Sequence, residues 1–211
     1  MPRKISESTV GRLSLYLRFL EEFERRGVTT VSSQALAVRG GTTAAQVRKD
    51  LSLFGSFGKR GLGYSVPELT AAVRKILGLG RQWRVALVGA GRIGSALFEY
   101  GDFRQRGFRI VCVFDSDPEK VGRAWGDVKI EDSAGLTEKL GREQVDIAIL
   151  AVPVDVVQEV SDRVVEAGVG AILNFAPTQL HVPPSVAVQH VNMSVELEAL
   201  SFALSRVEGA A

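Results

Sequence analysis

Apolar residues recur at helical spacing through the first third of the chain and predict a compact group of helices. Polar residues and glycines interrupt this pattern where helices are expected to begin and end. The pattern predicts three helices: one over 9–26 that ends at Gly27, a short one from Ser32 or Ser33 to Gly40-Gly41, and a third that begins at Thr42 or Thr43. This order is typical of a helix-turn-helix.

The third helix presents polar side chains opposite its apolar face. Ala44, Val47, Leu51 and Phe54 form the expected inner face. The outward positions are occupied by Gln46, Arg48, Lys49 and Ser52. Such side chains can contact base edges and phosphates, so this helix is a candidate for DNA recognition. The alternative is a small helical domain with a solvated basic face.

A glycine-rich segment, residues 55–64, follows the third helix and carries the adjacent cations Lys59 and Arg60. Tyr64 and Val66 then resume an apolar alternation, which predicts a hairpin wing with two cations at its tip. Pro67 opens a fourth expected helix over 68–77. We therefore expect a winged helix-turn-helix domain over residues 1–80, with a boundary near 80–83.

The remaining chain alternates short apolar runs with helical patterns, as a doubly wound parallel sheet requires. The first run, 84–88, continues into Gly89-Ala90-Gly91-Arg92-Ile93-Gly94 and then a helix. In this strand–turn–helix context the glycine pattern is typical of a Rossmann dinucleotide-binding domain. The next strand, 110–114, ends at Asp115, which can accept hydrogen bonds from ribose hydroxyls and favours NAD(H) over NADP(H). Nearby Lys120 and Arg123 leave that preference open.

Three later strands are expected at 146–150, 171–173 and 186–188. Ligands of such sheets bind beyond the carboxyl ends of the strands, so the segments Ala151-Val152-Pro153 and Asn174-Phe175-Ala176-Pro177 are expected to border a nicotinamide. For Pro153 and Pro177, simple strand termination is an equal alternative. The domain is expected to span 81–193.

The last helix, expected from Asn192 or Ser194 and assigned to residues 194–211, is apolar on more than one side. Such a helix usually needs burial on two faces. Either it packs into its own domain or it crosses into a partner subunit.

The two parts of the chain differ in net charge. Residues 1–80 contain 13 Lys/Arg and six Asp/Glu, whereas residues 81–211 contain 13 and 18. This asymmetry indicates that only the first part meets a polyanion. The single cysteine, Cys112, fits a reducing compartment and a core position. The polar start and short apolar runs argue against secretion and membrane insertion, so we expect a cytoplasmic protein.

Catalytic signals are weak. A dehydrogenase needs a substrate-binding region and a proton-transfer group, but only one helix is expected after the nucleotide-binding domain. His181 and His190 belong to no recognisable catalytic constellation, and no metal-ligand spacing is present. We therefore expect a regulator with no catalytic residues and no metal, the nucleotide being a signal. A small NAD-dependent oxidoreductase or nucleotide-binding enzyme subunit, with a CoA-binding fold as its nearest relative in shape, is the alternative.

Taken together, these segments resemble the Rex family of redox-sensing transcriptional repressors. The resemblance rests on the stretch from Gln46 to Tyr64, the fingerprint from Gly89 to Gly94, Phe114-Asp115 and Asn174 to Pro177. It implies a homodimer whose C-terminal helix is swapped between subunits and which leaves operator DNA when NADH binds. The expected DNA contacts are Gln46, Arg48, Lys49, Ser52, Lys59, Arg60 and Tyr64.

The resemblance also implies a link between the domains, made by an arginine, a tyrosine and an acidic residue. Arg18 and Tyr100 match the first two, and Asn192 stands at the third position, where it can accept a hydrogen bond from Arg18 but supplies no charge. An apolar pocket of Tyr100, Ala176 and Pro177 would disfavour the cationic, oxidised nicotinamide. The expected NAD(H) contacts are Gly89, Ala90, Gly91, Arg92, Ile93, Gly94, Tyr100, Asp115, Ser116, Lys120, Val121, Ala151, Val152, Pro153, Asn174, Phe175, Ala176 and Pro177.

Overall fold

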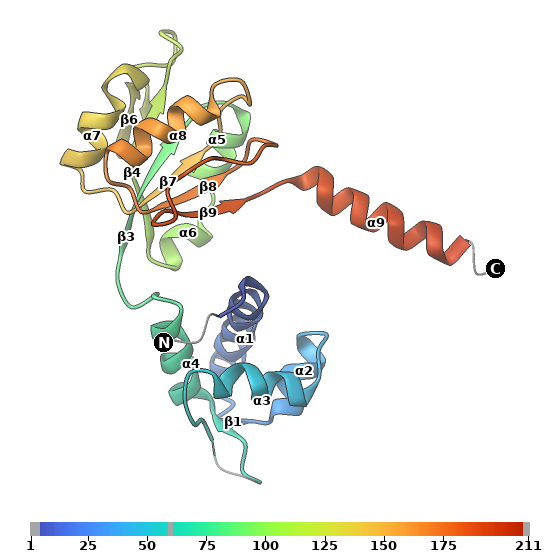
Figure 1. The fold of residues 1–211 in the computed structure, drawn as a ribbon. Helices are drawn as coiled ribbons and strands as arrows, with labels where there is room; N and C mark the ends of the chain where they lie inside the picture. Colours follow the sequence, from blue (N-terminus) through green and yellow to red (C-terminus); the bar gives the residue numbers. More distant parts are fainter. Residues whose placement is uncertain (1–4, 59–60, 209–211) are drawn as a thin grey trace. The chain divides into compact units, whose positions relative to one another are not determined.

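The computed structural model of the chain describes residues 5–58 and 61–208 (Figure 1). The chain forms two compact units, Met1–Arg81 and Gln82–Ala211. Each unit has its own buried apolar core. The two units are therefore described separately.

The described residues of the first unit form four helices. They are α1 (Glu7–Arg25), α2 (Ser33–Arg39), α3 (Ala44–Ser52) and α4 (Val66–Ile76). The side chains of Ser6, Ser32 and Thr43 each accept a backbone N–H three residues further on and so cap the first three helices. These caps and the glycine turn at 40–41 confirm the predicted helix-turn-helix order.

The strand after the glycine-rich segment pairs differently from the prediction. β2 (Tyr64–Ser65) is antiparallel to β1 (Thr30–Val31), which lies between α1 and α2. The predicted pairing within residues 55–66 is not found among the described residues of that segment, where the partner of β2 is β1. Val66 already belongs to α4, because Pro67 suits a first helical turn.

The second unit is built on a seven-stranded sheet with the order β5-β6-β4-β3-β7-β8-β9. Neighbouring strands are parallel except β5 and β6. From β6 to β9 this is the order of a Rossmann fold, with the reversal between β3 and β7. The strands are β3 (Trp83–Val88), β4 (Phe108–Asp115), β5 (Ala124–Trp125), β6 (Val128–Asp132), β7 (Ile147–Leu150), β8 (Ala171–Asn174) and β9 (Ala187–His190).

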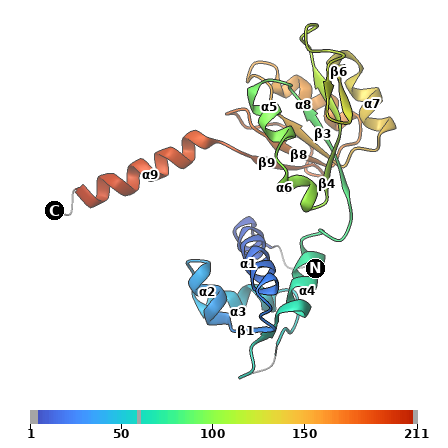
Figure 2. The same ribbon diagram turned by 180° about the vertical axis from the view of Figure 1, so that it is seen from behind.

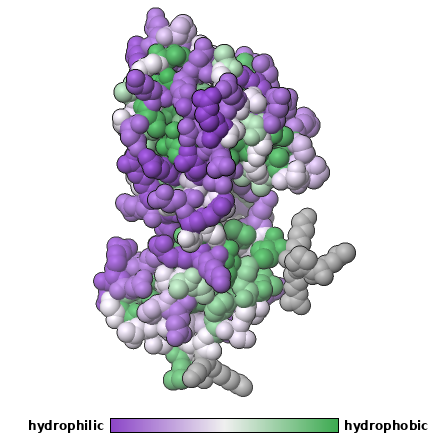
Figure 3. All heavy atoms as spheres, turned by 90° about the vertical axis from the view of Figure 1, so that its left-hand side faces the viewer, coloured by the Kyte–Doolittle hydropathy of each residue, from purple (hydrophilic) through white to green (hydrophobic). Residues whose placement is uncertain are grey.

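Helices cover both faces of this sheet (Figures 1 and 2). Residues alternate along β3: Ala86 and Val88 belong to one core with α7 (Leu136–Arg142) and α8 (Val157–Glu166), whereas Val85 and Leu87 belong to the other. That second core includes side chains of α5 (Arg92–Phe98) and α6 (Asp102–Gln105). Hydrophilic side chains cover most of the face of the second unit seen in Figure 3, with smaller hydrophobic patches between them.

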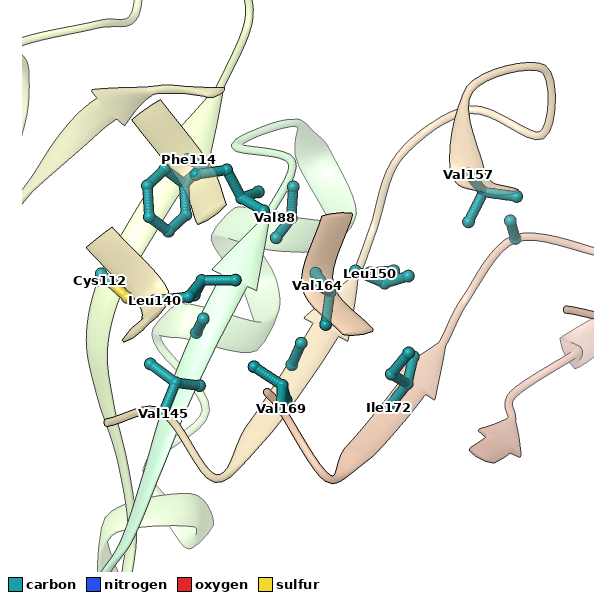
Figure 4. Close-up of a cluster of buried hydrophobic side chains, with 14 residues drawn as sticks. Val88, Cys112, Phe114, Leu140, Val145, Leu150, Val157, Val164, Val169 and Ile172 are labelled. Atoms are coloured by element: carbon teal, nitrogen blue, oxygen red, sulfur yellow. The ribbon is translucent and has the colours of Figure 1, made fainter. Parts of the chain in front are cut away.

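The first of these cores is shown in Figure 4, where Cys112 and Phe114 of β4 lie among aliphatic side chains. Cys112 is fully buried, and burial raises the pKa of its thiol to about 12. The expectation of a core cysteine is confirmed.

Several elements of this unit had no sequence prediction. They are α6, β5, β6, the 3-10 turn η1 (Ser133–Gly135) and α7. The last helix, α9 (Met193–Glu208), lies outside the layers that cover the sheet (Figure 1). Its apolar side chains Met193, Val195, Leu197, Leu200, Phe202 and Leu204 are all exposed. Of the two alternatives for this helix, packing into its own domain is therefore wrong, because these side chains are exposed.

Candidate functional site

A cavity of about 890 Å³ lies at the carboxyl ends of β3, β4 and β7. The glycine-rich turn, the end of β4 and the first turns after β7 and β8 all contribute to it. Its lining is Val88, Gly89, Gly91, Arg92, Ile93, Asp115, Ser116, Asp117, Lys120, Ser133, Ala151, Val152, Pro153, Val156, Glu159, Val160, Arg163 and Phe175. The cavity thus lies where a doubly wound sheet binds its ligand.

The three glycines of the turn have distinct environments. A Cβ on Gly89, whose φ is +100°, would lie 2.3 Å from the carbonyl oxygen of Ala151, and a Cβ on Gly94 would lie 1.9 Å from that of Gly89. Both positions therefore require glycine for close packing. A Cβ on Gly91 would meet nothing within 4 Å. Gly91 lines the cavity, so the missing side chain leaves room for a ligand group next to the backbone.

Asp115, at the end of β4, is held by three donors. Its Oδ2 accepts the backbone N–H of Ala90 at 2.7 Å and Nζ of Lys120 at 3.1 Å, and its Oδ1 accepts the N–H of Asp117 at 2.9 Å. Burial raises the pKa of Asp115, but these hydrogen bonds outweigh burial and leave the pKa below its ordinary value. The group is therefore a carboxylate at neutral pH, and Oδ1 retains one accepting position for a ligand hydroxyl.

Three cationic side chains line the cavity: Arg92, Lys120 and Arg163. Arg163 extends from α8 and donates to the carbonyl oxygens of Ser133 at 2.5 Å and Ala134 at 3.0 Å. Sequence reasoning missed this face of α8. Val156, Val160 and Arg163 are spaced by one helical turn, but only the packing of α8 shows that they face the cavity.

The lining contains most of the residues predicted from the sequence. Eleven of the predicted contacts line this cavity: Gly89, Gly91, Arg92, Ile93, Asp115, Ser116, Lys120, Ala151, Val152, Pro153 and Phe175. Seven others, Ala90, Gly94, Tyr100, Val121, Asn174, Ala176 and Pro177, are not part of this lining.

Asn174 organises the chain after β8 instead of facing the cavity. The side chain is fully buried, and its Oδ1 accepts the N–H of Ala176 at 2.9 Å. Its Nδ2 donates to the carbonyl oxygens of Ala176 and Thr178 and lies 3.1 Å from Nδ1 of His190. The Asn174 amide therefore connects the turn after β8 to β9.

The apolar pocket expected from Tyr100, Ala176 and Pro177 does not form within one chain. Tyr100 is 52% exposed, packs edge-on against Phe103 and lines a small hollow at α5 and α6. Ala176 and Pro177 line a different hollow beside Asn192 and the start of α9. The two segments therefore belong to separate surfaces of the second unit.

The predicted DNA-contacting face of α3 is on the surface of the first unit. Arg48, Lys49 and Ser52 are exposed, and Gln46 is half-buried. Arg48 donates to Oγ of Ser33 at 3.0 Å, which holds its guanidinium near the start of α2. Lys59 and Arg60 lie outside the described residues.

Tyr64 does not suit a DNA contact. It is only 8% exposed and belongs to the core of the first unit. Its burial raises the pKa of its hydroxyl. The expectation that its side chain touches DNA is therefore corrected: Tyr64 anchors β2 to the core.

The three residues expected to link the domains lie in different units. Arg18 is exposed on α1, and Tyr100 and Asn192 belong to the second unit. Oδ1 of Asn192 accepts the N–H of Ser194 at 3.0 Å, so this side chain stabilises the start of α9. Its role in an interdomain link stays a prediction.

Within residues 5–58 and 61–208, no three His, Cys, Asp or Glu side chains are grouped so that they could hold a metal ion. Over the same ranges, none of the helices combines the length and apolarity needed to cross a membrane.

Two protein families match parts of this chain. The family described as "Putative DNA-binding protein N-terminus" matches residues 4–52, which include α1 to α3. The CoA binding domain family matches residues 80–178, which include the glycine-rich turn and the cavity. The matches therefore fall on different units.

Similarity to whole proteins extends over nearly the entire chain. The redox-sensing transcriptional repressor Rex of Carboxydothermus hydrogenoformans is 50% identical over 203 residues, which are 96% of this chain and 98% of that protein. A crystal structure of RSP in complex with beta-NAD+ and operator DNA has a TM-score of 0.93 and 38% identity, covering 98% of this chain and 95% of that one. RSP in complex with beta-NADH has a TM-score of 0.89 and 36% identity, covering 98% and 97%. The chain belongs to the Rex family of redox-sensing transcriptional repressors.

Proposed function

We propose that this protein is a transcriptional repressor that binds operator DNA through its first unit and NAD(H) through its second. The observation that carries the proposal is the cavity at the point where the strand order of the sheet reverses. It contains Gly91, next to which no other atom fills the space of a side chain, and the ionised carboxylate of Asp115. The relatives support it, since they are named redox-sensing repressors and RSP is described with NAD+ and operator DNA and with NADH. The expectation of a regulator without catalysis agrees with these names.

The pyrophosphate of the dinucleotide would lie against Gly91, where the backbone is unobstructed. The remaining accepting position on Oδ1 of Asp115 suits one hydroxyl of the adenine ribose. A 2′-phosphate would bring negative charge to this carboxylate. Lys120 does not offset that repulsion fully, because its Nζ already pairs with Asp115 and Asp117. NAD(H) is therefore preferred over NADP(H).

Discrimination between the redox forms requires contacts that differ at the nicotinamide, because the rest of the ligand is shared. Val152, Pro153 and Phe175 give the cavity an apolar side next to the ends of β7 and β8. An apolar wall disfavours the cationic oxidised ring by desolvation and tolerates the neutral reduced ring. NADH is thus the ligand that shifts the protein away from its DNA-binding state.

Arg48, Lys49 and Ser52 on α3, with Lys59 and Arg60 of the wing, form the proposed DNA surface, and Gln46 adds a base contact. Arg48 and Lys49 are exposed and follow the N-terminal turn of the recognition helix, the part of such helices that enters the major groove. The wing cations suit the phosphate backbone or the minor groove.

The protein is proposed to act as a homodimer through α9. Six exposed apolar side chains on one helix form a surface that water disfavours, and a second copy of the chain would cover it. A dimer also matches the two-fold symmetry of operators read by helix-turn-helix proteins. NADH would favour a dimer whose recognition helices no longer fit both half-sites, and the protein would act in the cytoplasm.

The experiment is a fluorescence-anisotropy titration against palindromic duplexes at fixed salt, without ligand and with NADH, NAD+ or CoA. Loss of DNA binding with NADH, and retention with NAD+ and CoA, is expected. DNA binding that ignores all three ligands would contradict the sensor. Turnover of NADH with small carbonyl substrates would favour the oxidoreductase alternative.

A further inference from the structure

The carboxylate of Asp50, on the recognition helix, is 1% exposed and surrounded by hydrogen-bond donors. Its Oδ2 accepts Nε of Arg12 at 2.7 Å and the hydroxyl of Tyr16 at 3.0 Å. Its Oδ1 accepts Nη2 of Arg12 at 2.8 Å and Nε2 of Gln46 at 2.8 Å. Every accepting position of the carboxylate is therefore used, and three of the four bonds fix it to α1 or to the core.

This network determines which way the Gln46 amide faces. A carboxylate only accepts hydrogen bonds, so the atom of Gln46 next to Asp50 must be the nitrogen. The oxygen Oε1 of Gln46 receives no hydrogen bond from the described residues, and one N–H of the amide has no acceptor among them. Gln46 therefore keeps one unused acceptor and one unused donor side by side, with the orientation fixed by Asp50.

The sequence pattern around Gln46 predicts a different contact. A threonine N-cap followed three residues later by glutamine is the signature of a capping box, in which the glutamine side chain bonds back to the N-cap N–H. Here Oγ1 of Thr43 accepts the N–H of Gln46, but the Gln46 side chain points one turn forward to Asp50. The Gln46 side chain is therefore hydrogen-bonded to Asp50 and not to the backbone at the start of α3.

An acceptor beside a donor is the pair that adenine requires in the major groove, where N6 donates and N7 accepts. Gln46 lies in the first turn of α3, which contains the positions of a recognition helix that contact base edges. We propose that Gln46 reads one adenine in each half-site and that Asp50 is the positioning residue that holds its amide in the reading orientation. This inference rests on the proposed DNA-binding function.

The test begins with selection of duplexes from a random pool by the full-length wild-type protein, followed by base-by-base substitution of the selected site. Gln46→Ala is expected to lose about tenfold in discrimination at one A·T pair while preferences elsewhere in the site persist. Replacement of that adenine by 7-deazaadenine, which lacks the N7 acceptor, should weaken wild-type binding and leave Gln46→Ala unaffected. Gln34→Ala, which removes an exposed glutamine from α2, is the matched control and should retain every preference.

Asp50→Asn tests the positioning role. The amide nitrogen of asparagine is a donor, and it would face Arg12, Tyr16 or Gln46, which all donate to the carboxylate in the wild type. The variant should lose discrimination at the same A·T pair as Gln46→Ala, and the double variant should lose no more. A purely structural role for Asp50 would weaken binding to all sequences equally and would overturn its assignment. If Asp50→Asn fails to fold, Gln46→Ala with 7-deazaadenine still decides the base contact.

The proposed function and the role of Gln46 would be contradicted by different results. A wild-type protein that selects no sequence would contradict the proposed function itself. A wild-type protein that selects a site whose base preferences all survive Gln46→Ala would contradict only the inference about Gln46 and Asp50.

Discussion

The carboxylate of Asp115 accepts the backbone N–H of Ala90 at 2.7 Å, which ties the end of β4 to the glycine-rich turn after β3. One residue thus shapes the turn and lines the cavity. The same bond accounts for part of the lowered pKa of Asp115. Substitution of this residue therefore changes both the ligand's surroundings and the turn that approaches it.

Asp115→Ala is expected to weaken NADH binding about ten- to a hundredfold, because a charge-assisted hydrogen bond contributes about 1.5–3 kcal/mol and the turn loses its anchor. Isothermal titration with NADH measures this. DNA affinity without ligand should stay unchanged. Asp127→Ala, which removes an exposed carboxylate of the same unit, is the control, and an equal loss there would contradict a specific role for Asp115.

Alanine variants of Gly91 and Gly94 distinguish a loss of room for the ligand from a loss of folding stability. Gly91→Ala should fold with an unchanged melting temperature, since its Cβ meets nothing within 4 Å, but should lose NADH binding. Gly94→Ala should lower the melting temperature, since its Cβ would lie 1.9 Å from a carbonyl oxygen. Calorimetry and NADH titration of both variants check this. Normal NADH affinity in Gly91→Ala would exclude a ligand group at that position.

The cations of α3 should act mainly through phosphates. Removal of Arg48 or Lys49 by alanine is expected to weaken DNA binding at low salt and to reduce the slope of log K against log salt by about one for each phosphate that the variant no longer neutralises. Anisotropy titrations over a range of salt concentrations measure the slope. Lys75→Ala removes an exposed lysine from α4 of the same unit and should leave the slope unchanged.

The exposed apolar face of α9 should be required for assembly. Leu200→Asp combined with Leu204→Asp is expected to yield monomers, because a charge buried in an apolar interface is strongly disfavoured. Sedimentation velocity reports the state. The variant should still bind NADH, while its affinity for a palindromic duplex falls. Assembly that persists in this variant would place the interface elsewhere.

Arg12→Ala should destabilise the first unit by about 3 kcal/mol at neutral pH, because it leaves the Asp50 carboxylate buried without its cation. Burial raises the pKa of Asp50, but the bonds from Arg12, Gln46 and Tyr16 outweigh burial and lower the pKa overall. A lowered folded-state pKa gives stability that is present above the unfolded value of about 3.9 and is lost as pH falls through the folded pKa. The difference between wild type and variant should therefore shrink below about pH 4.

Urea unfolding followed by circular dichroism measures this difference. Both tryptophans, Trp83 and Trp125, belong to the second unit, so their fluorescence reports that unit separately and should not change with Arg12→Ala. A difference between wild type and variant that is constant with pH would contradict the assigned charge pair.

The sequence by itself determined the elements whose signals are local. Caps such as Ser32 and Thr43, the glycine fingerprint and Asp115 at the end of a strand act over a few residues, so their spacing predicts helix-turn-helix order and a nucleotide-binding turn. The helices of the first unit and most strands of the sheet lie where these signals place them.

Only the tertiary structure decided which distant residues meet. The pairing of β2 with β1, the approach of Arg163 to the cavity and the burial of Tyr64 depend on contacts across many residues of sequence, which no local period encodes. Gln46 shows this most clearly. The spacing between Thr43 and Gln46 favours a capping box, but the Gln46 amide donates instead to the buried carboxylate of Asp50, which can only accept hydrogen bonds. A buried charge needs every donor within reach, and that requirement prevails over a local capping preference.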